Sequence, residues 1–158
     1  MYHTQLPELV ELAQAFPGTT IILNHVGGAL GIGPYAGKRE EVFAEWNASI
    51  RVLARCRNVH VKLGGLGMRL FGFDFTARAL PPSSEVLAQS WRPDIEACID
   101  AFGPERCMFE SNFPVDKGSC SYAVLWNAFK RITASASTVE KQWLFSGTAS
   151  RVYRLSPD

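Results

Sequence analysis

Three short apolar runs that each end at polar residues alternate along this chain with amphipathic segments, and this alternation constrains the fold most strongly. The runs cover residues 19–23, 58–63 and 107–110 and are rich in β-branched or apolar side chains. Strands buried in a parallel sheet have this composition and length. Because a helical pattern separates each run from the next, we predict an α/β fold with parallel strands.

Apolar residues recur at intervals of three and four in the segments around the strands. This spacing predicts helices at about 6–16, 39–55, 122–133, 138–145 and 148–155, and one from Ser83 or Ser84 to Phe102. Pro93 should bend that helix or mark a join between two shorter ones. Residues 65–82, with two adjacent prolines and three phenylalanines, read as a long loop. The phenylalanines could form a hydrophobic lid or pack in the ordinary way.

Length and charge exclude several classes of protein. The 158 residues suffice for one domain, and 16 Lys and Arg against 15 Asp and Glu create no field that would attract nucleic acid or an anionic membrane. No signal sequence and no apolar run of about 20 residues is visible. The four cysteines form no C-x-x-C pair and read as reduced thiols. We therefore expect a cytoplasmic protein that acts on a small molecule.

Polar side chains follow the end of each predicted strand. In parallel β/α folds, functional groups collect where strands end and loops begin. The first strand ends at Asn24 and His25, the second at Lys62, and the third at Glu110, followed by Asn112 and Asp116. We predict that these residues border one active-site crevice.

His25 is the strongest single candidate, because Gly27 and Gly28 behind it would let a substrate approach closely. Its imidazole could bind a metal, bond a carbonyl or move a proton; alternatively, it is a hydrogen-bonded histidine at a strand end. Lys62 could neutralise a substrate carboxylate or an oxyanion, or reach into solvent. His60, two residues before Lys62, reads as a packed core histidine.

Glu110 and Asp116 supply carboxylates that could deprotonate water or coordinate a divalent metal. An ion pair for Glu110 and a cap for Asp116 are the structural alternatives.

The sequence Gly31-Ile-Gly33-Pro-Tyr-Ala36 comes near a dinucleotide-binding pattern, but it lies several residues past the strand, and no helix opens at its glycines. Neither a G-x-S-x-G motif nor zinc-type Cys/His spacing is present.

The ordered motifs of the chain resemble the amidohydrolase-related family, which includes sugar-lactone hydrolases, pyrone-dicarboxylate lactonase and some nonoxidative decarboxylases. The resemblance is carried, in order, by Gln5-Leu-Pro-Glu-Leu, Asn24-His-Val-Gly-Gly28, Asn58-Val-His-Val-Lys-Leu-Gly-Gly65, Arg106-Cys-Met-Phe-Glu-Ser-Asn-Phe-Pro114 and Thr148-Ala-Ser-Arg-Val-Tyr-Arg-Leu155. It implies the C-terminal portion of a (β/α)₈ TIM barrel, about strands six to eight, with His25 matching the family histidine of the sixth strand.

Two departures from the family pattern follow. The chain is shorter than the ~250 residues of a complete barrel, so we expect one domain over 1–158, incomplete at its N-terminus, and without the family's first-strand His-x-His pair. Family members usually show Gly-Ser-Asp-x-Pro at the eighth strand, where this chain has Glu110-Ser111-Asn112-Phe113-Pro114. Asn112 stands at the position of a metal ligand or general base, and an amide cannot take a proton at neutral pH.

The resemblance implies a hydrolase that opens a lactone or similar cyclic ester of a small sugar- or aromatic-derived acid. In this hypothesis Glu110 or Asp116 activates water, His25 polarises the carbonyl or protonates the leaving oxygen, Lys62 and Asn24 bind substrate, and Asn112 positions water or substrate. The complete barrel would use one divalent metal or none. The alternatives are an inert half-barrel or binding module, which could cover its open edges as a homo-oligomer, and a nonoxidative decarboxylase.

Overall fold

The computed structural model describes residues 1–77 and 79–155, and its centre is a three-stranded parallel sheet. The strands are β1 (Ile21–Leu23), β2 (Val59–Leu63) and β3 (Cys107–Phe109), in the order β1-β2-β3. The register pairs Leu23 with Val61 and Leu63 with Phe109. The predicted α/β class with parallel strands is therefore confirmed.

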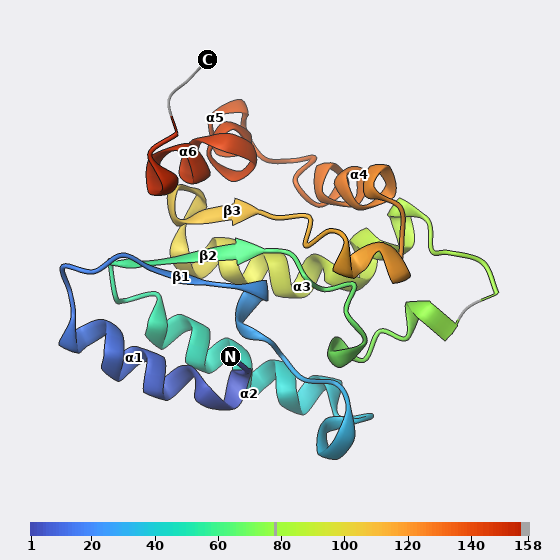
Figure 1. The fold of residues 1–158 in the computed structure, drawn as a ribbon, viewed down its shortest axis with the longest axis horizontal. Coiled ribbons are helices and arrows are strands. Elements are labelled where there is room, and N and C mark those ends of the chain that lie inside the picture. The colour runs from blue at the N-terminus through green and yellow to red at the C-terminus, as the bar shows by residue number, and fades with distance from the viewer. Residues whose placement is uncertain (78, 156–158) are drawn as a thin grey trace.

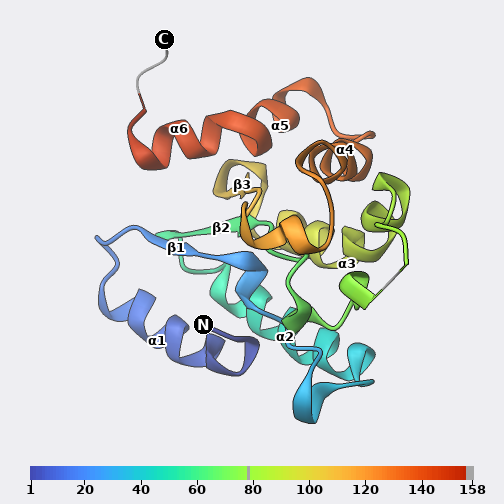
Figure 2. The ribbon, with the colours of Figure 1, turned by 45° about the vertical axis from the view of Figure 1, so that its right-hand side comes forward.

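Helices connect and cover the strands. They are α1 (Leu6–Ala15), α2 (Arg39–Leu53), α3 (Ser84–Phe102), α4 (Tyr122–Ile132), α5 (Thr138–Gln142) and α6 (Thr148–Tyr153). In Figure 1, α1 and α2 lie on the β1 side of the molecule, whereas α4, α5 and α6 lie beyond β3. The view in Figure 2 shows the same arrangement, with α3 packed close to the sheet.

The two faces of β2 differ in burial. Val59, Val61 and Leu63 are fully buried, whereas His60 and Lys62 are only partly buried. The hydrophobic core includes these three residues together with apolar side chains of α2 and α3, among them Trp46, Ile50, Leu87 and Ile95. Burial of these apolar side chains supplies the main free energy that holds the helices on the sheet. His60 is thus not the packed core histidine that the sequence suggested.

The structure decides two points about the helices that the sequence left open. Pro93 does not mark a join, because α3 runs unbroken from Ser84 to Phe102, and the buried neighbours Trp91 and Ile95 secure it on both sides of the proline. The last two predicted helices are also continuous. A π-helical turn, Trp143–Gly147, links α5 to α6, and buried Leu144 anchors it to the core.

The long segment 65–82 contains two short 3₁₀ turns, Arg69–Phe71 and Phe75–Ala77. Phe71 and Phe75 are buried, and Phe75 meets Trp91 edge to face at 6.1 Å between ring centroids. Ordinary packing accounts for these two rings. All four cysteines are buried and unpaired. Within the two described ranges, no helix is long and apolar enough to cross a membrane.

Candidate active site

The carboxyl ends of the three strands bring His25, Lys62 and Glu110 together. His25 opens a 3₁₀ turn directly after β1, Lys62 lies in β2, and Glu110 follows β3, where its backbone N–H donates to the Leu63 carbonyl at 3.3 Å. Because the strands are parallel and β1 and β3 both flank β2, their carboxyl ends lie at the same edge of the sheet. His25 and Glu110, 85 positions apart in the chain, meet there.

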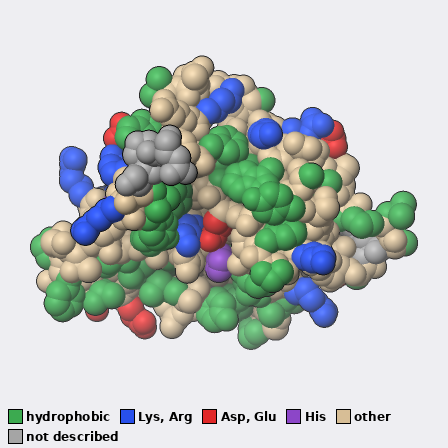
Figure 3. All heavy atoms as spheres, turned by 45° about the horizontal axis from the view of Figure 1, so that its top comes forward, with side chains coloured by type: hydrophobic (Ala, Val, Ile, Leu, Met, Phe, Trp, Pro, Cys, Tyr) green, Lys and Arg blue, Asp and Glu red, His purple; other side chains and the backbone are tan. Residues whose placement is uncertain are grey.

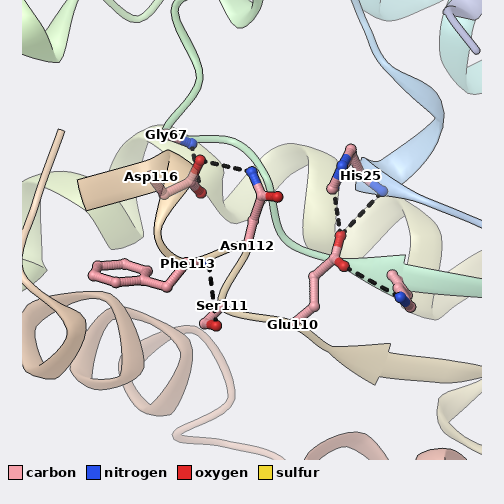
Figure 4. Close-up of polar contacts among 8 residues, drawn as sticks. His25, Gly67, Glu110, Ser111, Asn112, Phe113 and Asp116 are labelled. Atoms are coloured by element: carbon pink, nitrogen blue, oxygen red, sulfur yellow. Dashed lines mark hydrogen bonds and ion pairs between the residues drawn. The ribbon is translucent and has the colours of Figure 1, made fainter. Parts of the chain in front are cut away.

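Glu110 holds His25 by two contacts to one carboxylate oxygen. The backbone N–H of His25 donates to Oε1 at 3.2 Å, and ring atom Nδ1 lies 2.5 Å from the same oxygen (Figure 4). A carboxylate accepts but does not donate, so Nδ1 carries the proton, and in the neutral ring Nε2 presents its lone pair. In the described part of the chain, Nε2 has no hydrogen-bond partner. The ring is 30% exposed and can therefore reach a ligand.

Lys62 lies on the other side of the same carboxylate. Its Nζ is 3.6 Å from Glu110 Oε2 and 5.7 Å from the centroid of the Tyr153 ring, which comes from α6. Burial alone would lower the pKa of Lys62, but the hydrogen bond to Tyr153 and the charge of Glu110 outweigh it and raise the pKa. Lys62 therefore remains a cation at neutral pH.

Two glycines in the loop after β2 leave the space that the side chains of His25 and Glu110 occupy. A Cβ atom at Gly65 would lie 2.5 Å from His25 Nδ1, and one at Gly64 would lie 2.5 Å from Glu110 Cγ. Gly65 also has a φ of +72°, which disfavours other residues. Residue spacing alone predicted no role for these two glycines. Their position directly after a strand that ends in a candidate residue was the available signal.

Asp116 and Asn112 form a second, buried pair next to the first. Asp116 is fully buried; its Oδ1 accepts from Asn112 Nδ2 at 2.9 Å and its Oδ2 from the Gly67 backbone N–H at 3.3 Å. Burial raises the pKa of Asp116 to about 6, although both hydrogen bonds and the charge of His25 lower it. Asp116 is therefore not the turn cap considered as its structural alternative, but a carboxylate enclosed by the site.

Asn24 and His60 stand apart from these contacts. Asn24 is exposed, and its side chain makes no capping hydrogen bond to the turn that follows it. His60 lies two residues before Lys62 on the same strand face, and burial, together with Arg151 and Arg106, lowers its pKa.

The segment near the dinucleotide pattern forms only a three-residue 3₁₀ turn, Gly33–Tyr35, and Gly31 packs against the Phe71 carbonyl. It does not open an α-helix.

Acidic, basic and histidine side chains lie side by side in a hollow on the face drawn in Figure 3. Hydrophobic side chains border that hollow on both sides. An open, partly apolar hollow with a few convergent polar groups is the usual form of a small-molecule site. The arrangement offers a free imidazole nitrogen, a cation and a fixed amide to a ligand.

The described residues do not by themselves form a metal-binding site. Within 1–77 and 79–155, no group of three or more His, Cys, Asp or Glu side chains converges on one point. His25 could offer Nε2 as one ligand, with Glu110 orienting the ring from behind, but the carboxylate of Asp116 is already engaged by Asn112 and Gly67.

Comparison with known proteins decides the family. The family model described as "Amidohydrolase" (Amidohydro_2) matches residues 1–155. The chain belongs to this amidohydrolase family. In structure, it superposes with a TM-score of 0.82 on an amidohydrolase from Burkholderia multivorans crystallised with bound zinc, at 28% identity. That match covers 99% of this chain and 51% of the crystallised one, so the sheet and its helices are part of an amidohydrolase barrel.

Two curated proteins are similar to the chain over almost its whole length. The chain is 39% identical over 155 residues to the uncharacterized protein y4mH of Sinorhizobium fredii, covering 98% of this chain and 46% of that protein. It is 28% identical over 156 residues to L-fucono-1,5-lactonase of Burkholderia multivorans, covering 98% and 50%. The chain thus spans about half the length of the curated relatives that it matches.

Proposed function

We propose that this amidohydrolase-family chain supplies His25 and Glu110 to a site that hydrolyses a lactone or similar cyclic ester of a small hydroxylated acid. The observation that carries the proposal is the 2.5 Å contact between His25 Nδ1 and Glu110 Oε1, with Nε2 left open to a ligand. Membership of the family and 28% identity to a lactonase support hydrolysis as the reaction class.

The contacts of the two carboxylates favour His25 as the base. Glu110 uses Oε1 for His25 and Oε2 for Lys62, and both oxygens of buried Asp116 accept hydrogen bonds. Both carboxylates are thus held by donors of the protein, whereas Nε2 of His25 is left open. The sequence suggested that Glu110 or Asp116 activates water. The geometry favours His25 for that role instead.

In the proposed reaction, His25 takes one proton from water and later gives it to the leaving oxygen. His25 Nε2 accepts a proton from water as the oxygen of that water bonds to the lactone carbonyl carbon. Glu110 stabilises the imidazolium that forms, as the aspartate of a Ser-His-Asp triad does for its histidine. The ring C–O bond then breaks, and His25 returns the proton to the leaving oxygen. Lys62, held as a cation, attracts the developing oxyanion or a substrate carboxylate.

The test is a set of lactones assayed by acid release. Because the chain spans about half of its relatives, it is assayed both alone and joined in place of the matching half of the Burkholderia lactonase. We expect at least one preparation to open 1,5-lactones of sugar acids, with the lactonase as positive control. Absence of hydrolysis from both preparations, while the control is active and circular dichroism shows folded chains, contradicts the proposal.

Carbon dioxide is measured in the same reactions with a carboxylated lactone as substrate. Ring opening releases an acid and no CO₂, whereas a nonoxidative decarboxylase would release CO₂. Release of CO₂ without ring opening would assign the site to decarboxylation instead.

A further inference from the structure

Asn112 is held in one orientation by Asp116, which in its ionised form can only accept hydrogen bonds. Asp116 Oδ1 lies 2.9 Å from Asn112 Nδ2, and a carboxylate offers no proton to the other end of the amide. The amide nitrogen therefore faces Asp116, and the carbonyl oxygen Oδ1 points the opposite way. Figure 4 shows that oxygen directed away from Asp116, toward the side on which His25 lies.

The surroundings of Asp116 keep this orientation from reversing. Its Oδ2 accepts from the Gly67 backbone N–H, and the Gly67 carbonyl in turn accepts from the Ser119 hydroxyl. A Cβ atom at Gly67 would lie 2.9 Å from Asp116 Cγ, so the backbone approaches as closely as only glycine allows. The Asn112 backbone is itself in the left-handed region, with a φ of +51°, and its carbonyl accepts from the Asp116 N–H at 3.2 Å.

Burying a carboxylate is costly, which argues that the pair has more than a packing role. Asp116 is fully buried, and the other ionisable side chains nearby, His25 and Glu110, lie in the neighbouring pair rather than in contact with it. A well-packed apolar side chain would fill the same space at lower free-energy cost. What an apolar residue could not do is fix the amide of Asn112.

We propose that Asp116 is a positioning residue that fixes the Asn112 amide, so that Asn112 Oδ1 accepts a hydrogen bond from a hydroxyl group of the substrate. This inference rests on the proposed lactone hydrolysis and names the substrate class: a lactone that carries a hydroxyl group near the carbonyl. A neutral amide holds that hydroxyl without removing its proton, which leaves proton transfer to His25.

The orientation itself is tested in the 158-residue chain without any turnover. Side-chain NH₂ signals of asparagines are recorded by ¹⁵N–¹H NMR at pH 7.5. We expect the Asn112 protons to exchange slowly, with one shifted downfield by the carboxylate, and to become like those of exposed Asn24 in Asp116→Ala. Asn112 signals that match Asn24 in the unmodified chain overturn the inference, whether or not the protein hydrolyses lactones.

Exchanging the two residues separates positioning from packing. Asn112→Asp alone places two carboxylates at hydrogen-bond distance, so its unfolding midpoint should fall at pH 7.5. The double variant Asn112→Asp/Asp116→Asn restores one amide–carboxylate bond and should recover most of that loss, but now a carboxylate faces the hollow. In the lactone-hydrolysing preparation we expect the double variant to gain an additional acidic titration in its pH–rate profile. Full recovery of both stability and the original pH profile would show a purely structural pair and overturn the proposal.

The role toward substrate hydroxyls is tested with two 1,5-lactones. Asn112→Ala should lower kcat/KM roughly tenfold for L-fucono-1,5-lactone, the loss expected for one hydrogen bond to the ligand. δ-Valerolactone carries no hydroxyl groups, and its kcat/KM should change less than twofold. An equal loss for both lactones would place Asn112 on the attacking water and overturn the assignment of a substrate hydroxyl.

Discussion

At the scale of single residues, the site depends on side chains that only the folded chain brings together. The strand-end position and the family motif predicted His25, Glu110 and Lys62 as neighbours, because parallel strands end at one edge. They did not predict which nitrogen of His25 is free, or that Asp116 is buried and bonded to Asn112. Those features depend on side-chain rotamers and on loop backbone angles, which residue spacing does not determine.

Gly65 provides a prediction about the His25 ring. Gly65→Ala places a methyl group 2.5 Å from His25 Nδ1 at a φ of +72°, so we expect the free energy of unfolding to fall by about 2 kcal/mol and turnover to fall with it. Urea denaturation and the lactone assay measure the two effects. Gly18→Ala is the matched control, because open space surrounds Gly18, and it should change stability by less than about 0.5 kcal/mol. Equal behaviour of the two variants would contradict the packing described around His25.

At the scale of elements, amphipathic spacing predicted the helices, because burial on one face repeats with the helical period, and short apolar runs predicted the three strands. It left the effect of Pro93 open and did not predict the π-helical turn, because tertiary packing decides both. Apolar contacts on both sides of Pro93 keep α3 helical past the proline. A π-helical turn at Trp143–Gly147 connects α5 to α6. Neither a tolerated proline nor a π turn has a residue pattern that spacing alone reveals.

The contact between α2 and α3 gives a prediction about pH. Arg39 pairs with Asp94, which is fully buried, and burial raises the pKa of Asp94 to about 6 despite the arginine. The unfolded carboxyl titrates near 3.8, so the folded chain binds this proton more tightly. The group therefore stabilises the fold below about pH 4, and that contribution, about 3 kcal/mol, is lost as the pH rises through 6.

Asp94→Asn should remove this part of the pH dependence. Urea denaturation at a series of pH values between 4 and 7 gives the slope, and the variant should show a smaller fall in unfolding free energy than the unmodified chain. Asp116, raised in the same direction, keeps its own contribution in both proteins. Asp100→Asn, at an exposed position on the same helix, is the control and should leave the slope unchanged. A slope unaffected by Asp94→Asn would refute the raised pKa.

At the scale of the whole molecule, the chain is part of an amidohydrolase barrel and spans about half of its relatives. In the described part of the chain, β1 and β3 each pair with β2 alone, so each has one unpaired edge. Open edges favour pairing with another chain. We therefore predict that the purified chain forms homo-oligomers at micromolar concentration, measured by size-exclusion chromatography with light scattering. A clean, stable monomer would contradict this prediction.

The central claim is that His25, oriented by Glu110, transfers the proton in lactone hydrolysis. The most direct measurement compares turnover of L-fucono-1,5-lactone by the lactone-hydrolysing preparation with that of its His25→Ala variant, after circular dichroism has shown that both are folded. The account predicts a fall in kcat of at least ~10²-fold, the usual contribution of a general acid–base residue. Unchanged turnover would remove His25 from the mechanism and contradict the account.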